Sequence, residues 1–75
     1  MSIKIRISQT LAHEYDSRAV YDFITKSGTY SLTQEQAREL LEDALHNALH
    51  VDLLPRGVGR AYSALATNLM AQLDA

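Results

Sequence analysis

Three side chains with metal-binding chemistry stand four residues apart in the middle of the sequence. They are Glu42, His46 and His50, and on a helix this spacing places them on one face, one turn after another. Two histidines one turn apart can share a metal ion, with the carboxylate as a third ligand. The same spacing is also common on solvated helix faces, where the patch changes charge near neutral pH. We therefore predict no metal site and leave metal binding by His46 and His50 open.

The stretch PRGVGR has the composition of an anion-binding turn. Gly57 and Gly59 stand where a helix is expected to begin, and glycines there expose backbone N–H groups. Arg56 and Arg60 flank them, so the four residues form a candidate cradle for a phosphate or another anion. The alternative is that a carboxylate of the protein itself, from Asp52 or the acidic middle of the chain, neutralises the arginines.

The net charge is −2, and the acidic residues are concentrated in the middle of the sequence. Between residues 27 and 52, Arg38 is the only lysine or arginine among five carboxylates. On the helix expected there, four carboxylates form an acidic face that can meet a basic surface on another protein. These protein-binding candidates are Glu35, Glu39, Glu42 and Asp43. The alternative is a solvated face without a partner.

The first residues alternate between isoleucine and polar side chains. The stretch IKIRIS, residues 3–8, has the period of two that is typical of a strand with one wet side. An unpaired strand edge binds other chains by default, so the mate of this strand bears on function. The strand can pair with residues 29–32 or 51–54, lie along the helices, or pair with a second copy across a two-fold axis.

A ribbon made of two copies of this strand fits the major groove of duplex DNA. Together with the following helix, the turn at Gly28 and the helix after Thr33, the pattern over about residues 2–50 resembles the ribbon-helix-helix repressors. The resemblance implies a homodimer in which the outward side chains of the strand read bases. The nucleic-acid-binding residues are then Lys4, Arg6 and Ser8.

Three stretches have the spacing of amphipathic helices. We predict a strand over 2–8 and helices over about 9–26, 33–49 and 58–73. Thr33 and Gln36 fit a capping box before the second helix, whose apolar stripe extends from Ala37 to Leu49. The first helix carries an expected exposed ladder of alternating charge at Glu14, Arg18, Asp22 and Lys26. The prediction is a mainly α, single three-helix domain with one short N-terminal strand.

Length and composition limit the classes of function. Seventy-five residues form one domain, and 47% hydrophobic with 21% charged residues is typical of a soluble globular protein. The absence of cysteine excludes disulfides and a Cys-type zinc site. No spacing marks an activated nucleophile, and so small a core hardly encloses a pocket, so we expect no enzyme and no cofactor. No apolar run suits a membrane span or signal peptide, which predicts a cytoplasmic protein.

These observations favour a small non-catalytic binding module of the regulator or inhibitor type. We expect it to act by contact of its acidic helix face with a basic protein surface, as compact inhibitors from phages and other mobile elements often do. The alternative is a ribbon-helix-helix-like regulator that binds duplex DNA through its N-terminal strand. A homodimer is expected in either case.

Overall fold

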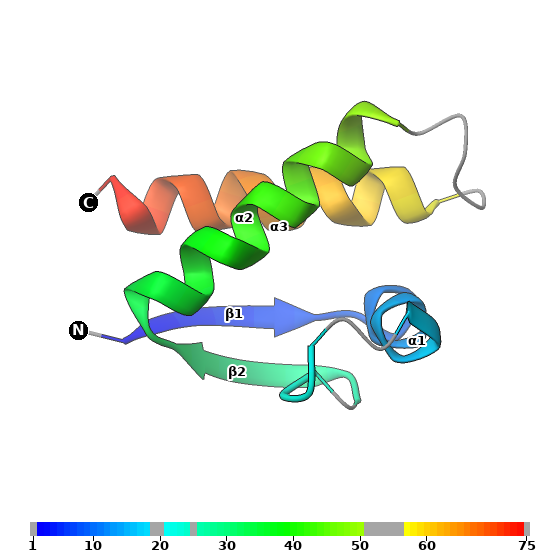
Figure 1. Cartoon of the computed structure of the whole chain (residues 1–75), viewed down its shortest axis with the longest axis horizontal. Helices are drawn as coiled ribbons and strands as arrows, with labels where there is room; N and C mark the ends of the chain where they lie inside the picture. The colour runs from blue at the N-terminus through cyan, green and yellow to red at the C-terminus, as the bar shows by residue number, and fades with distance from the viewer. Residues whose placement is uncertain (1, 19–20, 25, 51–56, 75) are drawn as a thin grey trace.

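One two-stranded antiparallel sheet and three helices make up the described part of the chain. The computed structural model describes residues 2–18, 21–24, 26–50 and 57–74. Along the chain the elements are β1 (Ile3–Ile7), α1 (Gln9–Arg18), β2 (Gly28–Leu32), α2 (Gln34–Leu49) and α3 (Val58–Leu73). Figure 1 shows α2 and α3 crossing on one side of the sheet, with α1 at the end where β1 stops. The predicted fold class, mainly α with a short N-terminal strand, is confirmed.

The strand β1 pairs with β2 of its own chain. In this antiparallel register Ile5 lies opposite Tyr30 and Lys4 lies opposite Ser31. The other edge of β1 is covered at Lys4, whose backbone bonds to the side chain of Gln72 on α3. The predicted ribbon of two copies is thereby replaced by a ribbon within one chain, because β2 takes one edge of β1 and Gln72 covers the other edge at Lys4. Of the intrachain mates considered, the segment around 29–32 is confirmed, and 51–54 lies outside the described residues.

The predicted helix over 9–26 is wrong in its last part. The helix α1 ends at Arg18, and residues 21–24 form a turn with a hydrogen bond from the Ile24 N–H to the Tyr21 carbonyl (3.3 Å). Aromatic and β-branched residues dominate this stretch of sequence, and they are weaker helix formers than alanine or leucine. Ile24 is buried in the core. The apolar residues that suggested a longer helix therefore anchor a turn, after which β2 returns beside β1.

The additional strand changes the order of elements from the one that the ribbon-helix-helix resemblance implied. That pattern runs strand, helix, helix, whereas this chain runs β1, α1, β2, α2, α3. The ribbon is consequently complete within a single chain. The two-chain ribbon implied by the resemblance is thereby corrected.

The two later helices occupy the predicted stretches, 33–49 and 58–73. The Thr33 hydroxyl accepts from the Gln36 N–H (3.1 Å), and Gln36 Oε1 accepts from the Thr33 N–H (3.0 Å), which completes the capping box of α2. The residue before α3 is Gly57, whose φ of 88° lies in the left-handed region that favours glycine. No described helix is long and apolar enough to cross a membrane.

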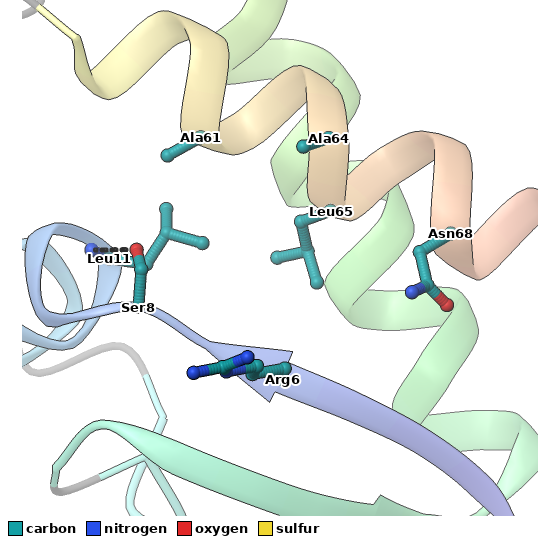
Figure 2. Close-up of a pocket in the computed structure, with 7 residues that line it drawn as sticks. All are labelled: Arg6, Ser8, Leu11, Ala61, Ala64, Leu65 and Asn68. Carbon is teal, nitrogen blue, oxygen red and sulfur yellow. Dashed lines mark hydrogen bonds between the residues drawn. The ribbon is translucent and has the colours of Figure 1, made fainter.

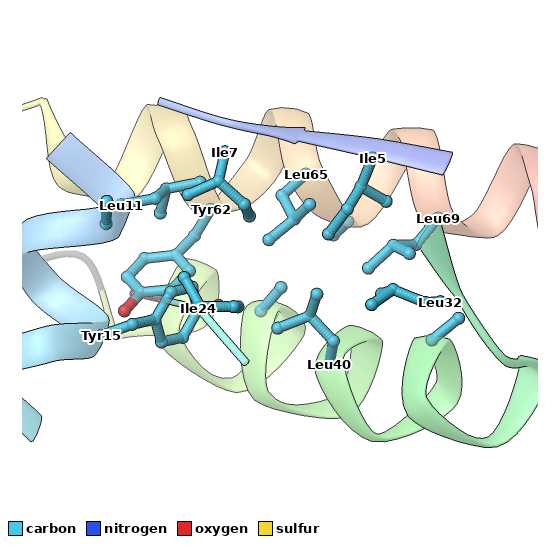
Figure 3. Close-up of a cluster of buried hydrophobic side chains, with 14 of the residues drawn as sticks. Ile5, Ile7, Leu11, Tyr15, Ile24, Leu32, Leu40, Tyr62, Leu65 and Leu69 are labelled. Carbon is cyan, nitrogen blue, oxygen red and sulfur yellow. The ribbon is translucent and has the colours of Figure 1, made fainter. Parts of the chain in front are cut away.

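The core lies between the sheet and the three helices. Figure 3 shows Ile5 and Ile7 pointing from β1 toward Leu40 of α2 and Leu65 of α3. Tyr15 of α1 and Tyr62 of α3 are fully buried beside them. Their rings meet edge to face, with centroids 5.7 Å apart. The three isoleucines of β1 thus join the sheet to every helix layer.

We predict that the core position Ile5 and its exposed neighbour Lys4 respond differently to substitution. Because Ile5 is 1% exposed, Ile5→Ala should lower the free energy of unfolding by about 2–5 kcal/mol, and Ile5→Val by about 1 kcal/mol. Lys4→Ala should change it by no more than about 0.5 kcal/mol, since only the Lys4 backbone makes the observed hydrogen bonds. Urea denaturation measures all three; equal losses at both positions would contradict the burial pattern.

Candidate functional site

The helix α2 presents three of the four predicted acidic residues to solvent. Glu35, Glu39 and Glu42 are exposed, and their spacing of four, three and seven residues places them on one side of the helix. Among the described residues none of the three forms an ion pair. This side of α2 therefore carries three carboxylates whose charge is not neutralised by the described part of the protein.

Two leucines extend this side toward the end of α2. Leu49 is 80% exposed and Leu45 is 38% exposed, although the apolar stripe predicted both to be buried. Leu49 follows Glu42 by seven residues, so the two lie on one line of the helix. Exposed large apolar side chains beside charges are typical of a protein contact surface. We name Glu35, Glu39, Glu42, Leu45 and Leu49 the α2 contact face.

Asp43, the fourth predicted acidic residue, faces the protein interior. Its Oδ1 accepts a hydrogen bond from the Arg18 guanidinium (3.1 Å), which also donates to the Tyr62 hydroxyl (3.0 Å). The Asp43 side chain is only 15% exposed. Its charge is paired within the protein, unlike that of the three exposed glutamates, and its role as a contact residue stays a prediction. The sequence did contain a sign of this inward position, because Asp43 stands three residues after the buried Leu40 and thus next to the apolar side of the helix.

Arg18 joins α1 to both other helices, an arrangement that the sequence did not reveal. Its place in the predicted charge ladder suggested an exposed side chain, and the side chain is 34% exposed while its guanidinium bonds to Asp43 and Tyr62. These charge-assisted bonds link α1 to α2 and α3. The buried residues Ala37, Leu40 and Ala44 determine which side of α2 faces the core, and the Arg18–Asp43 pair adds a polar link on that side.

Three tyrosines accompany the Arg18–Asp43 pair. The Tyr15 ring meets those of Tyr21 and Tyr62 edge to face, and the Tyr21 hydroxyl donates to the Glu39 carbonyl (3.2 Å). Burial, and then the Asp43 charge, raise the pKa of Tyr15. The Tyr15 hydroxyl and Asp43 Oδ2 are buried and lack a hydrogen-bond partner among the described residues. The neutral tyrosines thus form the inner support of α2.

The sheet turns the side chains of Lys4 and Arg6 toward solvent. They alternate with the buried isoleucines and lie opposite Ser31 and Thr29, which are also exposed. Opposite residues of an antiparallel pair project on the same face. Two cations and two hydroxyl groups therefore share the outer face of the ribbon.

Ser8, the third predicted nucleic-acid-binding residue, is engaged as the N-cap of α1. Its hydroxyl accepts from the Leu11 N–H (3.3 Å), and its carbonyl accepts from the Ala12 N–H (2.9 Å). The Ser8 hydroxyl is thus bonded to the first turn of α1, although the residue is exposed, and its role in nucleic-acid binding stays a prediction.

Charge is divided between the sheet and α2. The segments 2–10 and 26–34, which contain β1 and β2, hold three cations and no aspartate or glutamate: Lys4, Arg6 and Lys26. The α2 contact face holds carboxylates. Opposite charges on separate elements suit partners of opposite sign.

The predicted anion cradle is only partly described. Arg56 lies outside the described residues, as does Asp52, the carboxylate considered as its neutraliser. Gly57 precedes α3 without a side-chain cap, Gly59 lies in its first turn, and Arg60 is exposed. The described residues of this stretch are neighbours in sequence, so the structure adds no argument for anion binding here.

The rings of His46 and His50 lie close together on α2, with centroids 4.6 Å apart. Glu42 does not complete a metal site with them, since the described residues contain no group of three or more histidine, aspartate or glutamate side chains that could hold a metal ion. The two histidines border the α2 contact face near Leu45 and Leu49.

The fold and these surfaces define a small helical domain with two exposed faces of opposite charge. Comparisons with protein-family models, with curated proteins and with solved structures each find no match. Function is therefore argued from the geometry and chemistry of the two faces.

The tyrosines predict a loss of stability at alkaline pH. Burial, followed by the charges of Asp43 and Glu39, raises the pKa of Tyr21 to about 12, whereas an unfolded tyrosine titrates near about 10. The unfolded state therefore loses its proton first. The stabilisation is complete below about pH 10 and is lost as the pH rises toward about 12.

Urea denaturation between pH 8 and pH 12 (about the range that brackets both pKa values) measures this effect. Tyr21→Phe should weaken the pH dependence of the unfolding free energy. The reduction of this slope should stay well below about 1.4 kcal/mol per pH unit, the limit for one titrating group, because solvent screens a half-buried phenol. An unchanged slope in Tyr21→Phe would contradict the cause assigned to it.

Proposed function

We propose that this protein is a small non-catalytic binding module, a regulator or inhibitor that covers a basic surface of another protein. The observation that carries the proposal is the α2 contact face. On it, exposed carboxylates that form no ion pair within the described part of the chain lie beside a leucine that is 80% exposed. Carboxylates complement a lysine- or arginine-rich surface and accelerate the encounter. Leucines supply apolar area that is buried on contact.

Preorganisation supports this proposal. The capping box at Thr33 fixes the start of α2, and its buried residues Ala37, Leu40 and Ala44 set the side that faces the core. A helix that is already folded and oriented loses little conformational entropy on binding, so more of the contact energy contributes to affinity. The protein is proposed to act in the cytoplasm, and a nucleic-acid-binding groove of another protein has the required charge. Action as a phage or mobile-element inhibitor belongs to the same proposal, by analogy.

A homodimer also stays part of the proposal, through a different strand from the one first considered. Ser31 and Thr29 of β2 lie opposite Lys4 and Arg6. Because the Lys4 backbone points away from β2, the backbone groups of Ser31 and Thr29 point away from β1. The outer edge of β2 carries no charged side chain, and we propose that a second copy adds there.

Charge reversal on α2 tests the protein-binding proposal. The double variant Glu39→Lys with Glu42→Lys should weaken binding at least about tenfold, because it replaces attraction by repulsion at a basic surface. Purified nucleic-acid-binding proteins can be screened by biolayer interferometry for this loss. The matched control is Asp16→Lys with Asp22→Lys, which changes the net charge equally at two other exposed positions. Equal losses in both double variants would show a response to net charge alone and reject the face.

Binding of duplex DNA by the ribbon is the second candidate function. The specific observation in its favour is that Lys4 and Arg6 share an exposed ribbon face with Thr29 and Ser31 in a single chain. A two-stranded ribbon fits the major groove, where arginine and lysine pair with guanine and hydroxyl groups bond to either base type. The acidic α2 would then face away from the DNA.

The double variant Lys4→Ala with Arg6→Ala tests the DNA-binding candidate. It should abolish binding of a labelled duplex in fluorescence anisotropy. The parent affinity should fall with salt at a logarithmic slope of about −0.9 per phosphate contacted. The variant Glu39→Lys with Glu42→Lys should retain binding. A solution mass that duplex DNA leaves unchanged at low salt would remove this candidate.

A further inference from the structure

The groove between β1 and α3 contains an unpaired piece of strand edge. Gln72 accepts from the Lys4 N–H through Oε1 (3.1 Å) and donates through Nε2 to the Lys4 carbonyl (2.6 Å). Backbone groups point to alternate sides along a strand, so Arg6 also turns its N–H and carbonyl toward α3. Within the described residues no hydrogen bond satisfies these two groups of Arg6.

Beside Arg6 the groove widens into a hollow of about 250 Å³. Figure 2 shows it between β1, the start of α1 and the side of α3 that faces the strand. The small side chains of α3 leave the space open. The apolar lining consists of Leu11, Ala61, Ala64 and Leu65. The polar lining consists of Arg6, Ser8 and Asn68.

The charge of Arg6 determines which ligand suits the hollow. Its side chain is exposed and forms no ion pair among the described residues. It also borders a second, more polar hollow together with Gln9, the first residue of α1. The N-terminal end of a helix carries partial positive charge. Arg6 and α1 therefore both favour an anionic group at this point.

The residues on either side of Arg6 along this edge are already engaged. Gln72 occupies the strand edge at Lys4, and the carbonyl and hydroxyl of Ser8 serve the first turn of α1. Within the described part of this edge, Arg6 offers both a backbone donor and a backbone acceptor without a partner. So short a free edge favours the end of an added chain, and the positive surroundings favour its carboxylate end.

We propose that this hollow binds the carboxyl terminus of an extended peptide whose last residue is apolar. The peptide backbone pairs with the Arg6 backbone, as in other additions to a strand edge. The terminal carboxylate pairs with the Arg6 guanidinium. The last side chain fills the apolar lining next to Ala64 and Leu65. The site is separate from the α2 contact face and does not rest on the proposed function.

A direct test uses the peptide acetyl-Ala-Val-Leu with a free carboxyl terminus and the same peptide with a terminal amide. Titration into ¹⁵N-labelled protein should give saturable shifts of amide signals around the hollow, at Arg6, Leu65 and Asn68. The amide should bind at least about tenfold more weakly, because it removes a charge-assisted hydrogen bond. Equal binding of both peptides, or no saturable shift with either, would overturn the proposal.

Matched variants locate the site. Arg6→Gln should weaken binding of the free-carboxyl peptide at least about tenfold, and Ala64→Leu should block it by filling the hollow from an exposed helix position. Lys4→Gln removes the same charge from the same face of β1 outside the hollow and should bind like the parent. Equal damage by Lys4→Gln rejects the site. Glu39→Lys with Glu42→Lys should leave peptide binding unchanged, so the two proposals fail independently.

Discussion

The hydrogen bonds on the two edges of β1 are the constraint on which the rest of the molecule depends. On one edge β2 completes a ladder, and on the other the side chain of Gln72 covers Lys4. A strand held on both sides cannot rotate, so its isoleucines face the core and its cations face solvent. The same geometry leaves Arg6 as the one position where the covered edge opens into a hollow. Folding and the chemistry of the surface are thus set by one five-residue strand.

A second support acts on α2. The buried side of that helix sets the direction of its exposed carboxylates, and the Arg18–Asp43 pair beside the tyrosines links it to α1. Internal pairing of Asp43 separates a carboxylate with a structural role from the three that face solvent. Charged residues next to each other in sequence, Glu42 and Asp43, therefore have opposite roles. The positive ribbon and the negative helix face can serve different partners without competing for one surface.

Local signals allowed much of the fold to be predicted. The capping box at Thr33 and the apolar spacing of the later helices are properties of adjacent residues, so both helices were found. The strand β2 was not predicted as an element, because only Leu32 of its five residues is fully buried and no alternation is visible. The inward side chain of Asp43 and the exposed Leu49 depend on where α1 and α3 lie, and a single helix pattern does not contain that information.

The bridge between Lys4 and Gln72 also has a consequence for biosynthesis. These residues are 68 positions apart, so the edge of β1 stays open in the nascent chain until the end of α3 has been made. Contacts of such long range form late, because closure of the intervening chain costs entropy before the contact stabilises it. The emerging polypeptide is therefore exposed to strand pairing with neighbours for most of its synthesis. Gln72, near the end of α3, then covers this edge at Lys4.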